Sequence, residues 1–340
     1  MIVIKDVAKY ANVSISTVSK YFNHPEKLTA EYRSRIEKAV QELNYTPSII
    51  ARSIRSKKLN QLAVIVPDIA NPFYSELFSN MRDYAAALGY RVIVYTTQDD
   101  LNEMKVFVGN IDNILADGVI ICFLDEDEML SDFDELNKHI PVTLVGWDTH
   151  STNLNSVVVC INESFFKITQ HVIHLGHKRI AFLNGPAGSR ITKEKLDGFM
   201  RALDMAGLPI DESLIKNSRH KPMYGYHMTR SLMQSNDPPT AIICANDYLA
   251  IGCIKYLKQN EYHVPEDVVV TGHDGIQLAY IYEPTITTNA IPIPDICKSA
   301  VDMLIQKIER PRSKNCQAIF TTHLVEGKST NPNAPNIIEM

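Results

Sequence analysis

From Leu62 onward, short apolar segments alternate with helical segments, and this alternation limits the fold more strongly than any other feature of the sequence. Nearly continuous apolar strands that are joined by helices predict parallel sheets with both faces covered. The predicted strands are residues 62–67, 90–97, 118–124, 142–147, 179–185, 240–246 and 268–274. The predicted helices between them are residues 73–88, 102–116, 162–175, 190–206, 224–234 and 247–260.

This α/β pattern runs for about 260 residues, more than one sheet of ordinary size holds, so we expect two similar α/β lobes. In such folds ligands bind beyond the carboxyl ends of the strands. A cleft between two lobes offers two walls of this kind, and we expect a small-molecule site there.

Residues 4–45 have a different pattern of apolar residues, which recur at helical spacing in three short stripes. Ser14 and Thr29 stand where they can cap the second and third helices. The connection at residues 12–14 is as short as a helix-turn-helix requires. An ordinary three-helix packing unit has the same spacing, so this pattern alone leaves both interpretations open.

In a helix-turn-helix, the second helix lies in the major groove and presents its first residues to base edges. Other polar residues of the same helix hold phosphates. This geometry assigns Ile15, Ser16 and Lys20 to base edges, and Thr17, Ser19 and Asn23 to phosphates.

Charge is distributed unevenly along the chain, whose formal net charge is −5. Residues 1–60 hold eleven Lys and Arg against five Asp and Glu, a net charge of +6. The other 280 residues hold 23 bases and 34 acids, a net charge of −11. A basic head on an acidic body indicates a polyanion partner for the head. A solvated helix surface has the same composition, and charge alone does not separate the two.

The six cysteines are scattered, and four of them (Cys122, Cys160, Cys244 and Cys316) lie in strand-like apolar runs, which predicts reduced core thiols. No paired C-x-x-C ligands are present, so we expect no structural metal. No apolar run approaches the roughly 20 residues that cross a bilayer. The first residues lack the pattern of a signal peptide, and a cytoplasmic location is the expectation.

An enzyme is the first alternative class, but the sequence has no P-loop, no G-x-S-x-G and no H-E-x-x-H. His171, His174 and His177 form the most tempting cluster. Gly176 is expected to end their helix before His177, which favours ordinary helix-end histidines over a metal site. Asp247 is interpreted as a helix N-cap. The second alternative, a sugar receptor for transport, requires a secretory signal and no basic head.

Three N-terminal segments, IKDVAKYANVSISTVSKYFN, LNYTPSIIARSIR and IVPDIANPFY, resemble the head, hinge and first core strand of LacI/GalR-family repressors. The similarity continues through GHKRIAFLNGP, PTAIICANDYLAIG, VPEDVVVTGHDG and TTHLVEGKST. The resemblance implies an all-α helix-turn-helix head, a hinge helix, and a two-lobed α/β core like that of periplasmic sugar-binding proteins, crossed by three connections. It also implies homodimers, sometimes tetramers, that bind palindromic operator DNA.

This resemblance predicts the organisation of the chain. Pro47 ends the third helix, and the short hinge that follows is expected to fold only with a partner, because helix nucleation is costly. The predicted parts are a helix-turn-helix head (1–46), a hinge helix and linker (47–60), an effector-binding and dimerisation core (61–330) and a flexible tail (331–340). The N-lobe takes about 61–160 and 291–320, and the C-lobe about 161–290 and 321–330.

The resemblance also implies which residues bind DNA. Ser16 and Lys20 match base-contacting positions, and Ile54 matches the hinge residue that wedges into a central minor-groove step and kinks the duplex. Lys20 stands where many members have Arg, which replaces a bidentate fork with a point charge. The predicted DNA contacts are Ile15, Ser16, Thr17, Ser19, Lys20, Asn23, Tyr45, Ser48, Arg52 and Ile54.

The resemblance also implies which residues bind the effector, and we expect no cofactor and no metal. Carboxylates and amides bind hydroxyl groups and aromatic rings stack on sugar faces, so a sugar or sugar derivative is the expected effector. A plain core anchor is the alternative for Trp147. Lys195 replaces an Arg that is typical of the family, and Val3 replaces a Thr that caps the first helix. The predicted effector contacts are Phe73, Tyr74, Trp147, Asp148, Arg190, Lys195, His220, Asn246 and Asp274.

Overall fold

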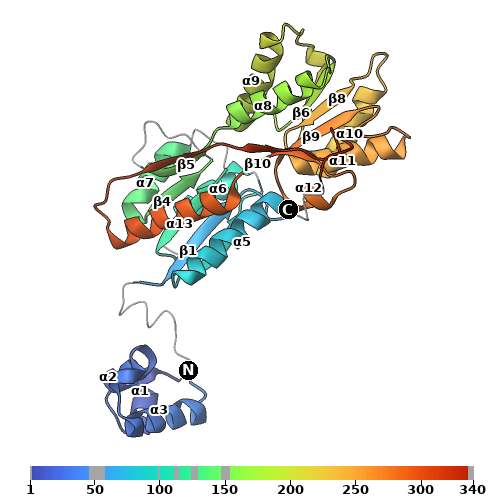
Figure 1. Ribbon diagram of the computed structural model, residues 1–340. Helices are drawn as coiled ribbons and strands as arrows, with labels where there is room; N and C mark the ends of the chain where they lie inside the picture. Colours follow the sequence, from blue (N-terminus) through green and yellow to red (C-terminus); the bar gives the residue numbers. More distant parts are fainter. Residues whose placement is uncertain are drawn as a thin grey trace. The chain divides into compact units, whose positions relative to one another are not determined.

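The computed structural model describes residues 2–45, 58–98, 100–110, 115–123, 129–146 and 154–335, without the side chains of Asn23 and Leu101. The chain divides into two compact units, Met1–Leu59 and Asn60–Met340 (Figure 1). Within the described ranges, no helix combines the length and the apolar character that a membrane span requires. Five predicted site residues lie outside the described residues: Ser48, Arg52, Ile54, Trp147 and Asp148.

The first unit consists of helices packed on a small apolar core. Its helices are α1 (Ile4–Tyr10), α2 (Ile15–Asn23), the 3₁₀ turn η1 (Pro25–Lys27) and α3 (Ala30–Glu42). The buried residues lie in all three α-helices and directly after α1 and η1, in agreement with the three predicted stripes. They are Val7, Ala8, Ala11, Val18, Leu28, Ile36 and Ala39.

Side-chain caps begin these helices as the sequence predicts. Ser14 Oγ accepts from the Thr17 N–H at 3.1 Å, and Thr29 Oγ1 accepts from the Tyr32 N–H at 3.4 Å. Val3 gives α1 no side-chain cap. The Asp6 carboxylate accepts from the Val3 N–H at 2.9 Å instead, and this bond ties down the start of the helix.

Replacing Ser14 with alanine should destabilise the head by about 1 kcal/mol, because the orphan amide at the start of α2 loses its acceptor. Ser14→Gly should cost only a few tenths of a kcal/mol, since glycine leaves that amide open to water. Hydrogen exchange of the α2 amides in the full chain measures both values. Equal protection in the two variants would contradict this role for the Ser14 hydroxyl.

The first sheet of the second unit has the strand order β11-β5-β4-β3-β1-β2, and every pair in it is parallel. Its helices lie on both faces (Figure 1). The strands are β1 (Gln61–Val66), β2 (Arg91–Thr96), β3 (Gly118–Cys122), β4 (Val142–Val145), β5 (Asn155–Val159) and β11 (Gln317–Phe320). The helices are α5 (Pro72–Ala87), α6 (Leu101–Gly109), α7 (Leu130–His139) and α13 (Ile293–Glu309).

Strand β1 shows why its apolar run is nearly continuous. Leu62 and Val64 belong to the core that also contains Leu77 of α5. Ala63 and Ile65 belong to a separate core on the opposite face, with α6 and α7. Successive side chains of a strand point to opposite faces, so both sets must be apolar when helices cover both faces.

The second sheet has the order β12-β10-β9-β8-β6-β7, and only β12 runs antiparallel to its neighbour. This confirms the predicted class of two mainly parallel sheets flanked by helices. The strands are β6 (Ile180–Asn184), β7 (Ile215–Asn217), β8 (Ala241–Cys244), β9 (Val269–Asp274), β10 (Thr287–Ala290) and β12 (His323–Val325). The helices are α8 (Ile161–His174), α9 (Arg190–Met205), η4 (Glu212–Leu214), α10 (Pro222–Met233), α11 (Asp247–Gln259) and α12 (Gln277–Ile281).

The chain crosses between the two lobes three times, as the family resemblance implies. The crossings lie between β5 and α8, between β10 and α13, and between β11 and β12. The last two bring α13 and β11 back into the first lobe and β12 back into the second (Figure 1).

Four details differ from the sequence-based expectations. Helix α6 ends at Gly109 rather than at 116, because Gly109 and Asn110 are poor helix formers. Cys316 is exposed and Cys160 is half-buried, so neither is the core thiol expected of it. The first part of the expected tail forms a turn in which the Ala334 N–H donates to the Asn331 carbonyl at 2.9 Å, and Ala334 is buried.

Candidate functional site

Helix α2 of the head presents polar side chains on one face and buries its other face. Ser16 and Lys20 are exposed and lie four residues apart, so they share a face. Val18 is fully buried on the opposite side. Ile15 is half-buried against the core, which makes it an anchor of α2 as well as a candidate base contact. The Thr17 and Ser14 hydroxyls lie 2.7 Å apart, at the start of the helix.

Arg35 of α3 holds the turn between α1 and α2. Its guanidinium donates to the Ala11 carbonyl at 2.7 and 3.1 Å, and to the Asn12 carbonyl at 2.8 Å. Asn12 has a φ of 50°, a left-handed conformation that asparagine tolerates better than most residues. These contacts fix the angle at which α2 leaves the turn, and no sequence pattern pointed to Arg35.

The remaining predicted DNA contacts are less exposed than Ser16. Ser19 is half-buried. Tyr45 is also half-buried, and its ring lies 6.0 Å from that of Phe22, so it anchors the end of the head beside α2. Nothing is described of the Asn23 side chain.

The carboxyl ends of the two sheets of the core meet at a boundary that three polar contacts between described residues bridge. Each contact joins a residue of the first lobe to one of the second. The contacts are Arg190 Nη2 to the Gly146 carbonyl at 3.2 Å, Lys221 Nζ to Asp68 Oδ2 at 3.5 Å, and the Gln277 N–H to Glu76 Oε1 at 3.0 Å.

A buried lysine lies on the second-lobe side of this boundary. Lys195 of α9 is only 6% exposed, which is rare for a lysine. Its ammonium group donates to the Ala245 carbonyl just beyond β8 at 2.9 Å. It also lies 5.5 Å from the centre of the fully buried Phe165 ring, a cation–π contact.

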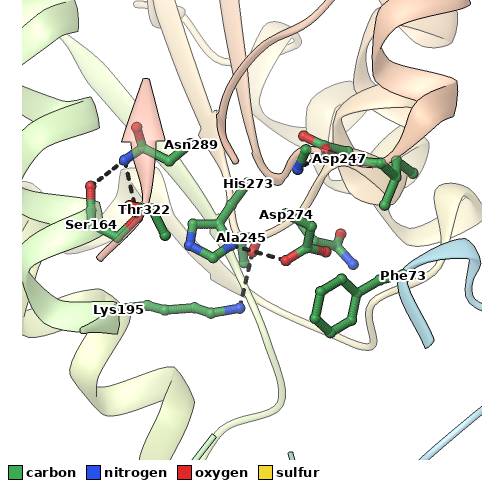
Figure 2. A network of polar contacts seen from close by, with 12 residues as sticks. Phe73, Ser164, Lys195, Ala245, Asp247, His273, Asp274, Asn289 and Thr322 are labelled. Atoms are coloured by element: carbon green, nitrogen blue, oxygen red, sulfur yellow. Dashed lines mark hydrogen bonds and ion pairs between the residues drawn. The ribbon is translucent and has the colours of Figure 1, made fainter. Parts of the chain in front are cut away.

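Beside Lys195, the end of β9 carries a buried histidine and a buried aspartate (Figure 2). The His273 ring stacks on Phe165 at 4.9 Å, and its Nδ1 lies 2.9 Å from Asp274 Oδ1. Burial raises the pKa of Asp274 to about 7, although the Lys195 ammonium acts in the opposite direction. Asp274 has a φ of 110°, a strained conformation of the kind that clusters at functional sites.

This raised pKa predicts a pH-dependent stability. An unfolded aspartate loses its proton near pH 3.8, whereas Asp274 in the folded chain keeps it until about pH 7. The stabilisation from the protonated carboxyl is therefore present below pH 3.8 and is lost as the pH rises to 7. Asp274→Asn cannot ionise, so its melting temperature should rise relative to the wild type between pH 4 and 8. A constant difference across that range would contradict the raised pKa.

Asn246 and Asp247 have roles that the sequence did not reveal. Asn246 Oδ1 accepts from the Leu249 N–H at 2.9 Å, so Asn246, not Asp247, is the N-cap of α11. Asp247 is fully buried and its Oδ2 accepts from the Gly275 and Ile276 amides at 2.8 and 3.0 Å. Asp247 therefore holds the turn directly after Asp274, and the interpretation of it as a cap is wrong.

His220 contributes a neutral imidazole to the same region. Burial lowers its pKa to about 3, and the positive charge of Lys195 adds to this effect. Its Nε2 atom is buried and has no hydrogen-bond partner among the described residues. A Cβ atom on Gly185 would lie 2.6 Å from that nitrogen, so only glycine leaves room beside it.

The first lobe contributes aromatic side chains to the boundary. Phe73, buried at the start of α5, makes edge contacts with Tyr74 at 5.1 Å and with Phe123 at 5.2 Å. Figure 2 shows the Phe73 ring beside the Asp274 side chain. Arg190 is paired with Glu194 one helical turn away. The structure thus places every described effector-contact prediction near the carboxyl ends of the strands.

No three His, Cys, Asp or Glu side chains of the described ranges are grouped as a metal ion requires. His171, from the histidine cluster, lies 3.9 Å from Glu326, and burial lowers its pKa. Helix α8 ends at His174, and Gly176 follows with a φ of 94°. These observations agree with helix-end histidines.

Comparison with known proteins assigns both units. The family model for bacterial regulatory proteins of the lacI family matches residues 3–48, and that for the periplasmic binding protein-like domain matches residues 169–330. The transcriptional repressor PurR of Aliivibrio salmonicida is 30% identical over 323 residues, which cover 95% of this chain and 96% of that repressor. The chain belongs to the LacI family.

Other LacI-family proteins agree with this assignment over the whole length. The transcriptional regulator DegA of Bacillus subtilis is 30% identical over 331 residues, 97% of this chain and 98% of that regulator. A lac repressor dimer bound to operator and the anti-inducer ONPF has a TM-score of 0.84 at 25% identity, covering 97% of this chain and 99% of the repressor chain. This LacI-family chain is therefore a DNA-binding transcription regulator and not an enzyme.

Proposed function

We propose that this regulator is a homodimeric repressor that binds palindromic operator DNA, and that a sugar or sugar derivative controls its affinity for DNA. In this proposal the head at 1–46 and the hinge at 47–60 bind DNA, and the core at 61–330 binds the effector and dimerises. The observation that carries the proposal is the burial of the Lys195 and Asp274 side chains near the aromatic Phe73 at the lobe boundary.

The chemistry of these groups suits a polyhydroxylated ligand. The Asp274 carboxyl group can accept from one hydroxyl, and the Lys195 ammonium can donate to another. The Phe73 ring offers an apolar face to the C–H side of a sugar ring. A buried polar group that loses its partner costs about 1–3 kcal/mol, so a site built from such groups rejects ligands that lack the matching hydroxyls.

DNA binding is proposed for the exposed face of α2. Ser16 and Lys20 are exposed on this face and would contact base edges. The Ser16 hydroxyl also lies 2.7 Å from the Ser14 hydroxyl, which orients it at the start of the helix. One head offers few base contacts, and a two-fold dimer doubles them and reads a palindrome. The basic charge of the head supplies affinity for any duplex.

Selection from a random DNA pool with the full chain tests this function. We expect enrichment of a palindromic site that Lys20→Gln binds more weakly, with base preference relaxed at one position in each half-site. A pool in which no sequence is enriched at physiological salt would contradict operator binding, and a single unpaired half-site would contradict the dimer.

The effector is found by a thermal-shift screen of the chain against sugars, sugar phosphates and nucleobases. A ligand at 100 times its dissociation constant stabilises the folded chain by about 2.7 kcal/mol. We expect a sugar or sugar derivative to stabilise the chain and to lose this effect in Lys195→Met. If only nucleobases stabilise the chain, the proposed effector class is wrong and a nucleobase takes the place of the sugar. The proposed binding site at the lobe boundary would then remain unchanged.

A further inference from the structure

A second polar cluster, separate from the effector-contact residues, lies buried in the second lobe. The Asn289 amide group donates to the Ser164 carbonyl at 2.5 Å and to the Ser164 hydroxyl at 3.0 Å. The Thr322 hydroxyl donates to the same Ser164 hydroxyl at 2.8 Å. All three residues are at most 7% exposed, and Figure 2 shows them converging.

Each of the three residues lies in or beside a different crossing between the lobes, on its second-lobe side. Ser164 lies in the first turn of α8, directly after the first crossing. Asn289 is the penultimate residue of β10, just before the second crossing. Thr322 lies within the third crossing, between β11 and β12. The cluster therefore joins the second-lobe ends of the three crossings that the described residues form between the lobes.

Backbone bonds tie the same crossings together and to the effector wall. The Cys160 N–H donates to the Phe320 carbonyl at 3.0 Å, which links the first crossing to the third. The Ile291 N–H donates to the Asp274 carbonyl at 3.0 Å, which links the second crossing to Asp274. In addition, Phe165 follows Ser164 in α8 and stacks on His273.

We propose that Ser164, Asn289 and Thr322 form a polar lock that fixes the angle between the lobes, and that groups binding at Asp274 act on this lock. Buried hydrogen bonds are either made or broken, because an unpaired polar group in the core is costly. A rotation of one lobe against the other must twist the backbone of the three crossings, and these bonds hold the second-lobe ends of the crossings at a fixed spacing. The lock thus favours one angle between the lobes over the others. Only the effect of a ligand bound at Asp274 on this lock rests on the proposed function.

The Gln277 amide reports the lobe angle without any ligand. Its acceptor, Glu76 Oε1, lies on the other lobe, so lobe rotation exposes this amide to exchange. We expect hydrogen exchange at Gln277 in the full chain to become about tenfold faster in Asn289→Leu, which removes two bonds, and about threefold faster in Thr322→Val, which removes one and keeps the shape.

Matched controls use buried residues of the same type whose hydrogen bonds do not link the crossings. Asn155 of β5 donates to the Met303 carbonyl at 3.2 Å and accepts from the Cys316 amide at 2.9 Å, all in the first lobe. Thr169 of α8 donates to the Phe165 carbonyl at 2.7 Å. Asn155→Leu and Thr169→Val should leave Gln277 exchange within about twofold of the wild type, although they lose as many hydrogen bonds.

Acceleration at Gln277 in the lock variants alone, with β1 and β9 amides still protected, supports the lock. Unchanged exchange in Thr322→Val, or equal acceleration in the controls, overturns it. Thr322→Val decides the matter if Asn289→Leu fails to fold. Because no ligand and no DNA are used, the outcome is independent of whether the proposed effector response exists.

Discussion

At pH 8, where the Asp274 carboxyl group is mostly ionised, replacing it with asparagine should weaken effector binding about 10- to 100-fold and leave operator binding without effector unchanged. A hydrogen bond to a charged group contributes roughly 1.5 to 3 kcal/mol. Asparagine keeps the shape of the side chain and tolerates the positive φ of this position. It also keeps an oxygen that can accept from His273 Nδ1. The variant therefore removes the carboxylate and little else.

Asp267 supplies the matched control for this experiment. It is a second-lobe aspartate that also contacts a histidine, His263, at 3.0 Å, but at the surface. Titration calorimetry with the ligand from the thermal screen should give the wild-type affinity for Asp267→Asn. A similar loss in both variants would assign the effect to general destabilisation, and no loss in Asp274→Asn would remove Asp274 from the site.

The second large effect concerns Ile54, which lies outside the described residues and is assigned only by the family resemblance. Ile54→Ala removes the apolar wedge and leaves the basic head intact. Operator affinity should fall roughly 100-fold, because the cost of unstacking a base step is no longer offset. Salt-dependent binding to random DNA should survive, since it rests on phosphate contacts.

Operator and random-sequence affinities measured side by side at fixed salt check this prediction. Ile54→Leu serves as the control, because leucine is an apolar wedge of the same size and should be tolerated. An equal loss of both affinities in Ile54→Ala would mean that Ile54 stabilises the protein rather than the kinked DNA.

Much of the fold was predictable because its signals are local. The run at β8 is apolar at every position and is fully buried, so a short segment reveals the strand. Strand β11 was not predicted, since it lies at the edge of its sheet and Ile319 is 61% exposed. Helix α13 has a regular apolar stripe, but Pro292 and Pro294 at its start hide its first turn in the sequence.

The site was predictable only where the family resemblance supplied positions. Lys195 and Asp274 were named in this way, and the structure adds that both are buried and which groups they contact, Ala245 and His273. His273 and Asn289 were missed, because each acts through contacts with residues more than 100 positions away, Phe165 and Ser164. One local signal could have revealed His273. It is the pair of consecutive polar residues, His273 and Asp274, at the end of an apolar strand.

The most direct test of effector control is a fluorescence-anisotropy titration of the selected operator with the wild-type chain, at fixed salt, with and without a saturating amount of the ligand found in the screen. A ligand that favours one core arrangement by about 3 kcal/mol changes operator affinity on the order of 100-fold. We predict two curves separated by that amount and a much smaller separation on random DNA. Superimposable curves, for a ligand that demonstrably stabilises the chain, would contradict control of the head by the core.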